Sequence, residues 1–153
     1  MKHPLVLLLF IGLQLILSSF SECPQESTIV EVRYGSSFGK CSGFCIQEVS
    51  FKKGTATKTL IPHRDKSLTA RKCSRDYEEF ESLTSKIDMK AFNEMEVTIG
   101  CPDCKDEGAE WVQVITTDGI QKKVTYSFGQ EPEAFAPFIA ELRSYYEEIG
   151  MCD

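Results

Sequence analysis

The sequence predicts an α+β domain, in which helices pack on one face of a mainly antiparallel sheet of about five strands. Two patterns predict this fold class. Segments that alternate between apolar and polar residues occur in neighbouring runs joined by short turns, which is typical of hairpins. Segments with apolar residues three and four positions apart follow each group of strands, which is typical of amphipathic helices. The expected order is strand-strand-strand-helix-helix-strand-strand-helix, and seven cysteines could form disulfides that brace it.

The N-terminus, residues 1–21, is expected to be a secretory signal peptide and is set apart from the fold. Leu5–Leu17 is an almost unbroken aliphatic run, and Ser19 and Ser21 occupy the minus-three and minus-one positions of a signal-peptidase site. A membrane-spanning helix needs roughly 20 apolar residues, and this run is shorter. The sequence therefore predicts a secreted, extracellular protein with one domain, residues 22–153, and with no membrane span.

The first half of this domain carries three expected strands. Thr28–Tyr34 alternates and is rich in β-branched residues. Phe44–Lys52 alternates with one interruption, which fits a strand with a bulge. A Lys-Gly turn then leads into Thr55–Ile61, the expected hairpin partner. Residues 63–72 are polar and basic, and we expect an exposed loop there.

The second half carries the expected helices and a further hairpin. Apolar residues at helical spacing run from Ser74 to Ile87, and a shorter helical segment covers 88–95. Glu110–Thr116 and Gln121–Phe128 alternate around a Thr-Asp-Gly turn, which predicts a hairpin. The last helix is expected between Pro132 and Gly150, because proline favours a helix start and glycine a helix end.

The charge balance narrows the classes of partner. The formal net charge is −6 at pH 7, whereas a nucleic-acid-binding domain is expected to be basic. The same sign disfavours an anionic membrane surface. The expected partners are an extracellular protein or matrix, and divalent cations or mineral are further candidates because carboxylates are in excess.

Four of the cysteines lie in two short motifs, Cys41-x-x-x-Cys45 and Cys101-x-x-Cys104. In an exported protein we expect them to form structural disulfides. Each motif could close on itself, or the bonds could cross between the motifs, and the sequence leaves both pairings open.

The other three cysteines leave one unpaired, because seven is an odd number. Domain termini often lie close together, so we expect Cys23 to bond Cys152 near the two ends of the domain. This leaves Cys73 as the free or intermolecular cysteine, which would allow a disulfide-linked dimer.

Two chemical alternatives use the same motifs. Four thiolates from Cys41, Cys45, Cys101 and Cys104 could bind zinc, but that chemistry suits a reducing compartment. A thiol–disulfide active site at Cys101 and Cys104 would need a helix N-terminus to lower the thiol pKa. Here acidic residues and a strand follow the motif, so structural disulfides remain the favoured interpretation.

Other candidate site residues are few. Asp103, Asp106, Glu107 and Glu110 could offer oxygens to calcium, but their spacing does not match an EF-hand loop, and a solvated acidic turn is the simpler interpretation. His63 is the only histidine outside the predicted signal peptide, and it lies in a polar segment. With no nucleophile motif beside it, we expect no catalytic residues and no cofactor.

Two segments together prompt a comparison, Tyr34–Cys45 and Gly100–Trp111. The chain resembles a small family of exported domains with a Gly-x-Ser-Phe-Gly-x-Cys-x-Gly-aromatic-Cys loop and a later Gly-Cys-Pro-Asp-Cys segment, over most of Ile29–Leu142. The resemblance implies that the four cysteines within these segments belong to a shared framework, and it brings no activity with it. Three cysteines would then be additions in this chain: Cys23, Cys73 and Cys152.

The leading hypothesis is a secreted, non-enzymatic, disulfide-braced α+β domain that acts by binding or as a component of extracellular matrix, including mineralised matrix. The alternative is a secreted thiol–disulfide oxidoreductase that uses Cys101 and Cys104.

Overall fold

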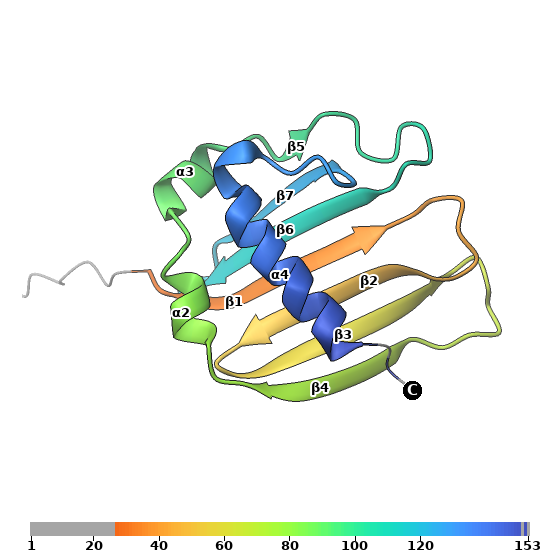
Figure 1. Cartoon of the computed structure of the whole chain (residues 1–153), viewed down its shortest axis with the longest axis horizontal. Coiled ribbons are helices and arrows are strands. Elements are labelled where there is room, and N and C mark those ends of the chain that lie inside the picture. The colour runs from red at the N-terminus through yellow and green to blue at the C-terminus, as the bar shows by residue number, and fades with distance from the viewer. Residues whose placement is uncertain (1–26, 151, 153) are drawn as a thin grey trace, which may run out of the picture.

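A computed structural model describes residues 27–150 and 152 of the chain, and the predicted signal peptide lies outside them. The described chain is an α+β domain with one mixed sheet, and α4 crosses the face of the sheet that is turned toward the viewer in Figure 1. The α+β class predicted from the sequence is confirmed.

Seven strands form this sheet, in the order β4-β3-β2-β1-β6-β7-β5. All neighbouring strands are antiparallel except β5 and β7, which are parallel. The β1–β4 meander is therefore joined to the β6–β7 hairpin through the central pair β1–β6. The strands are β1 (Ile29–Ser37), β2 (Gly43–Lys52), β3 (Gly54–His63), β4 (Arg71–Tyr77), β5 (Thr98–Ile99), β6 (Ala109–Thr116) and β7 (Gln121–Ser127).

The described helices are two short ones between β4 and β5 and a longer one at the end of the chain. The Asp88 side chain accepts a hydrogen bond from the Ala91 backbone N–H (3.0 Å) and so caps α3. Gly150, with φ of 72°, ends α4. The helices are α2 (Phe80–Thr84), α3 (Met89–Glu94) and α4 (Ala136–Ile149), and a 3-10 turn, η1 (Glu133–Phe135), precedes α4.

The core lies between α4 and one face of the sheet. Alternation along β1 places Val32 and Tyr34 on this face, and α4 contributes Ile139 and Leu142 from one side of the helix. The short helices add to the same core, for example through Phe92 of α3. All the described helices therefore cover the same sheet face, and the opposite face, called here the open face, carries mostly polar side chains.

The strand count differs from the prediction of about five strands. β4 occupies a stretch that was expected to be a polar loop followed by the start of a helix. Its side chains are nearly all exposed, so the segment has no apolar alternation that could identify it. Backbone pairing with β3, from Gly54 opposite Tyr77 to Leu60 opposite Arg71, forms the strand instead. The helix expected from Ser74 is correspondingly shortened to α2.

β5 was also missed, and it is the reason that the sheet is mixed. It has only two residues, which pair in parallel with Thr125 and Tyr126 of β7. A two-residue strand has no measurable periodicity. Its position depends on the path that the chain takes from α3 to the second cysteine motif.

Candidate functional site at the meeting of the two cysteine segments

The two segments that carry the cysteine motifs lie side by side in the centre of the sheet. The end of β1 pairs with the start of β6, so that Gly35 lies opposite Trp111, Ser36 opposite Glu110, and Ser37 opposite Ala109. Residues that are more than 70 positions apart in the sequence therefore form one structural unit. The loops that carry the cysteines extend from this pair at the same end of the sheet.

Trp111, the only tryptophan, covers this unit on the open face of the sheet. The Trp111 ring packs over Gly35, where an added Cβ would lie 2.6 Å from Trp111 Cε2 and 2.7 Å from the Gln47 carbonyl oxygen. Trp111 Nε1 donates to the Glu48 carboxylate (3.4 Å), and the Lys123 ammonium lies 4.0 Å from the ring centroid. The ring is only 6% exposed, so it braces the strands and is not available as a stacking surface.

The two cysteine loops contact each other directly. The Gly39 N–H donates to Asp103 Oδ1 (3.4 Å), and Lys40 forms an ion pair with Asp106. Gly108 lies against the Phe38 ring. These contacts join the β1–β2 loop to the β5–β6 loop, and they engage two of the four acidic residues that were considered as calcium ligands.

The structure resolves the pairing that the sequence left open. Cys41 bonds Cys45, and Cys101 bonds Cys104, with Cα–Cα distances of 5.6 and 5.5 Å. Each motif therefore closes on itself, and the bonds do not cross between the motifs. Because these sulfur atoms are bonded to one another, they do not supply the four thiolates of the zinc site considered above.

The expectations for Cys73 and for the chain ends are wrong. Cys73 is not free but bonds Cys152, which is 3% exposed. Cys73 lies on the face of β4 that α4 covers, and the residues that follow α4 reach that strand. The Arg71 guanidinium also donates to the Cys152 carbonyl oxygen (3.4 Å). The predicted Cys23–Cys152 bridge is therefore replaced, and Cys23 itself lies outside the described residues.

Glu110 lies on the opposite, helix-covered face, where it is 1% exposed. The Tyr34 hydroxyl donates to Glu110, and the Gly129 N–H donates to Glu110 Oε2 (3.0 Å). Arg143, from α4, donates to both oxygens of the carboxylate at 3.2 and 2.9 Å. Arg143 also donates to Glu131 (3.2 Å). This Glu110 cluster thus ties β1, β6, the β7–η1 loop and α4 together.

The protonation states in the cluster follow from burial and charge. Burial, followed by the hydrogen bond to Glu110, raises the pKa of Tyr34, so this phenol stays neutral at physiological pH. Burial alone would lower the pKa of Arg143, but hydrogen bonds to Glu131, Tyr34 and Glu110 outweigh burial and raise it. Arg143 is therefore a permanent cation that compensates the two carboxylates.

Two buried hydroxyls in the described part of the chain have no hydrogen-bond partner, those of Tyr77 and Tyr126. Tyr126 is the one near this cluster, because it lies opposite Glu110 in the β6–β7 pair. Burial, and then the charge of Glu110, raise the pKa of Tyr126. Tyr126 is therefore a neutral phenol in the folded protein. A hydroxyl donor without a partner adjacent to a carboxylate cluster is most simply a tolerated core tyrosine.

Neither Glu110 nor Arg143 was identified as an interior residue from the sequence, although a signal was present. Glu110 has the same alternation parity as Val112 and Val114, which predicts the core face of β6. Arg143 lies four residues after Ile139, on the same side of the last helix. A carboxylate and a guanidinium that both fall on core faces are candidates for a buried pair.

The four proposed calcium ligands do not converge. Asp103 and Asp106 are engaged by the neighbouring loop, and Glu110 points to the interior. Within residues 27–150 and 152, no group of three or more His, Cys, Asp or Glu side chains is arranged to hold a metal ion. His63 ends β3 and lines a shallow depression of about 500 Å³ together with Cys41 and Lys66.

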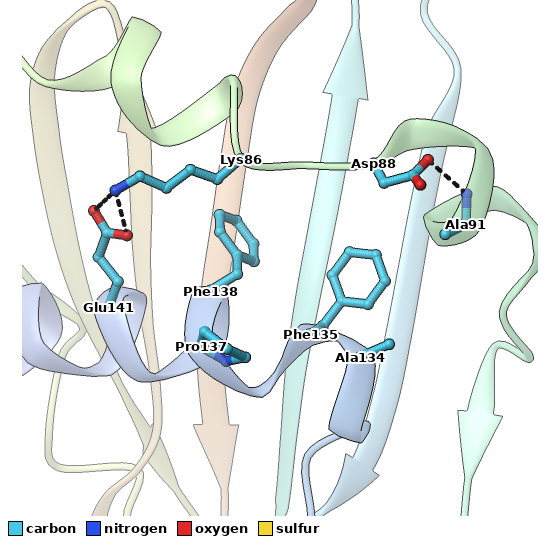
Figure 2. Close-up of a pocket in the computed structure, with 8 residues that line it drawn as sticks. All are labelled: Lys86, Asp88, Ala91, Ala134, Phe135, Pro137, Phe138 and Glu141. Carbon is cyan, nitrogen blue, oxygen red and sulfur yellow. Dashed lines mark hydrogen bonds and ion pairs between the residues drawn. The ribbon is translucent and has the colours of Figure 1, made fainter.

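A separate cavity of about 360 Å³ lies between the α2–α3 connection and the start of α4 (Figure 2). Phe135 and Phe138 point into it from below, and Lys86 and Asp88 border it from above. Lys86 forms an ion pair with Glu141 (2.7 Å), while Asp88 caps α3. The charged groups at its rim are thus already engaged, and the cavity offers an apolar floor without a free charge.

No helix among the described residues is long and apolar enough to cross a membrane. Comparison with known proteins gives no match: no family model, no curated protein and no solved structure corresponds to this chain.

Proposed function

We propose that the protein is a secreted, non-enzymatic domain that acts by binding or as a component of extracellular matrix. Three disulfides within the described part of the chain support an oxidising destination. They are also what a small exported domain would use to remain folded outside the cell.

One observation carries the proposal: the reactive groups gathered at the cysteine segments are engaged with one another. Glu110 is compensated by Arg143 and by the Tyr34 hydroxyl. Asp103 and Asp106 of the β5–β6 loop contact the β1–β2 loop. A site arranged in this way holds strands and loops together, and it leaves no base or nucleophile poised for a substrate.

The rival is a thiol–disulfide oxidoreductase, and one observation favours it: both Cys101 and Cys104 are exposed or partly exposed on a surface turn. The surroundings oppose it. The motif is followed in the chain by a turn and β6, so it does not open a helix whose N-terminus would lower a thiol pKa. Asp103 and Asp106 in the same loop would disfavour a thiolate.

The matrix version relied on an unpaired cysteine, which the sequence predicted to be Cys73. Cys73 is bonded within the chain, so among the seven cysteines the one outside the three bonds is Cys23, and the candidate for a crosslinking thiol moves to that residue. The acidic composition remains, but two of the loop carboxylates are already engaged. We therefore propose binding through a protein surface ahead of capture of mineral by an acidic loop.

Peptide mapping without reduction, combined with an insulin-reduction assay, tests the proposal. We expect peptides that contain the three bonds described above, and no acceleration of insulin reduction in the presence of glutathione. The double variant Cys101→Ala, Cys104→Ala should behave like the matched variant Cys41→Ala, Cys45→Ala in this assay. Catalysis by the unmodified protein that disappears only in the Cys101, Cys104 variant would establish the rival function.

A further inference from the structure

β4 forms one edge of the sheet, and no described strand pairs with its outer side (Figure 1). It is seven residues long, contains no proline, and is exposed over most of its length. The outward-facing backbone N–H and C=O groups of such a strand are a template for another strand. The charges on β4 determine which strand would fit.

The charges on the open face of β4 are arranged symmetrically about Ser74. Pairing with β3 places Lys72, Ser74 and Asp76 on this face, opposite Thr59, Thr57 and Thr55. Lys72 and Asp76 thus stand two residues before and two residues after Ser74, with opposite charges. Both are exposed, and neither has an ion-pair partner within the described chain.

We propose that β4 pairs with β4 of a second copy of this chain, antiparallel, about a two-fold axis at Ser74. A two-fold axis perpendicular to the sheet keeps every residue on its own face, so residues that lie opposite each other must share the same alternation parity. With Ser74 opposite Ser74, Lys72 of each copy lies opposite Asp76 of the other. Opposite charges directly across two strands stabilise the pairing.

The other symmetric registers oppose like charges. An axis at Cys73 places Arg71 opposite Arg75 twice, and an axis at Lys72, Arg75 or Asp76 places that charged residue opposite itself. Like charges directly across an antiparallel pair are destabilising. Among the registers centred on Lys72 to Asp76, only the one at Ser74 forms ion pairs and opposes no like charges.

The helix-covered face is compatible with this register. There, Cys73 would lie opposite Arg75, and Arg71 opposite Tyr77. Arg71 is already turned toward its own chain, where it donates to Cys152 and lies 5.0 Å from the Phe44 ring centroid. Edge strands are commonly protected from association by charges. On the open face of β4, however, one charge of each sign stands at self-complementary positions, so a second copy in this register meets opposite charges there.

The resulting dimer would be one continuous sheet with both α4 helices on the same side. It requires no cysteine, so it is independent of the intermolecular disulfide expected from the sequence, and it does not depend on the proposed function. The shared contact would be the strand edge itself and two ion pairs.

Sedimentation velocity of the full secreted chain, treated with iodoacetamide without reductant, tests this proposal. We expect a monomer–dimer equilibrium that depends on protein concentration. Lys72→Asp or Asp76→Lys alone should weaken the dimer about tenfold or more, because each places two pairs of like charges across the axis. The swap Lys72→Asp with Asp76→Lys should restore the dimer to within about threefold of the unmodified protein, since it re-forms both ion pairs.

Lys90→Asp is the matched control for Lys72→Asp, because Lys90 is exposed on α3 and the two substitutions change the net charge by the same amount. It should leave the equilibrium unchanged. A protein that stays monomeric throughout, or a dimer that tolerates both single reversals, would overturn the proposal. So would failure of the double swap to restore association when the circular dichroism of the variant shows that it is folded.

A crosslink checks the register independently. In a Cys23→Ser background, Ser74→Cys should give a covalent dimer under mild oxidation, because this position lies opposite itself. Thr57→Cys, one strand further in, should not. A covalent dimer from both variants, or from neither, would contradict the register.

Discussion

Glu110 is the least exposed charged residue in the described part of the chain. Its carboxylate is 1% exposed, and its compensation comes from Arg143, the Tyr34 hydroxyl and the Gly129 N–H. A buried ion is tolerated only when other groups replace the water that it has lost. The Glu110 side chain therefore links the sheet to α4, and removing its charge should lower the stability of the whole domain.

We expect Glu110→Gln to lower the free energy of unfolding by about 3 kcal/mol, near the lower end for breaking a buried pair, because Arg143 keeps 30% of its side chain exposed. Glu131→Gln removes the more exposed partner of the same arginine and should cost about 1 kcal/mol or less. Urea unfolding followed by circular dichroism measures both. Equal losses of stability in the two variants would show that Glu110 is not the main link between the sheet and α4.

Gly35 is constrained by the tryptophan that packs over it. A Cβ at this position would lie within 2.7 Å of both the Trp111 ring and the Gln47 carbonyl oxygen, so Gly35→Ala should cost about 1–3 kcal/mol through overpacking. Because Trp111 is the only tryptophan, its fluorescence reports the change directly. Gly39→Ala is the comparison, since the three atoms nearest its Cβ all belong to the Asp103 carboxylate, the end of a side chain that can move. A Gly35→Ala variant with unchanged stability and unchanged Trp111 fluorescence would contradict this packing.

At the scale of elements, the end of α4 is held to the sheet edge in two ways. Lys58 of β3, which is 3% exposed, donates to the Tyr146 carbonyl oxygen (3.1 Å) in the last part of the helix. Beyond the helix, Cys152 bonds Cys73 of β4. Without the disulfide, β4 would depend on its backbone pairing with β3 and on a few side-chain contacts.

The three disulfides should differ in their contribution to stability. The Cys73–Cys152 bond joins residues 79 apart, and the Cys41–Cys45 bond joins residues 4 apart. By loop-closure entropy, replacing the first pair with alanine should cost about 4–5 kcal/mol and replacing the second pair about 2 kcal/mol. Thermal unfolding of the two double variants tests this order. A larger loss from the Cys41, Cys45 pair would contradict it.

Elements with their own periodicity could be predicted from the sequence. β1, β6 and β7 alternate because one of their faces is buried, and α4 has an apolar side because it packs on that face. β4 could not be predicted, since a strand at an exposed edge needs no apolar residues and forms because β3 offers free backbone groups. β5 could not be predicted either, because its position depends on the path that the chain takes from α3 to the second cysteine motif.

At the scale of the whole molecule, the acid stability of the domain should depend on Glu31. Burial alone would raise the pKa of Glu31, but hydrogen bonds from Arg33, Ser50 and Lys52 outweigh burial and lower it from its ordinary value of 4.5. A carboxylate with a lowered pKa in the folded state stabilises that state above its unfolded pKa. The stabilisation is lost as the pH falls through the lowered value.

We therefore expect the free energy of unfolding to fall as the pH drops below about 4.5, and Glu31→Gln to reduce this dependence while lowering stability at pH 7. Urea midpoints measured between pH 7 and pH 3 test this. Glu94→Gln is the control, because Glu94 is exposed on α3 and forms no ion pair within the described residues. A variant whose stability changes with pH as steeply as that of the unmodified protein would exclude a role for Glu31.

The candidate site was only partly accessible from the sequence. The two cysteine segments stood out by their composition, and the structure does bring them together. Their joint role depends on contacts such as Gly39 with Asp103, between loops that the sequence does not place relative to each other. The alternation of the predicted strand Glu110–Thr116 gives Glu110 the parity of the core residues. The sequence does not identify its partner, because Arg143 reaches Glu110 only when α4 packs on the sheet.

The sequence by itself determined the α+β class, the main hairpins, the last helix and the expectation of an exported, disulfide-braced chain, because these depend on local periodicity, turn residues and composition. Only the tertiary structure decided that Cys73 bonds Cys152, that β4 completes the sheet, and that Glu110 is buried against Arg143. These outcomes depend on distances between distant segments, and such distances exist only after the sheet and α4 have packed together.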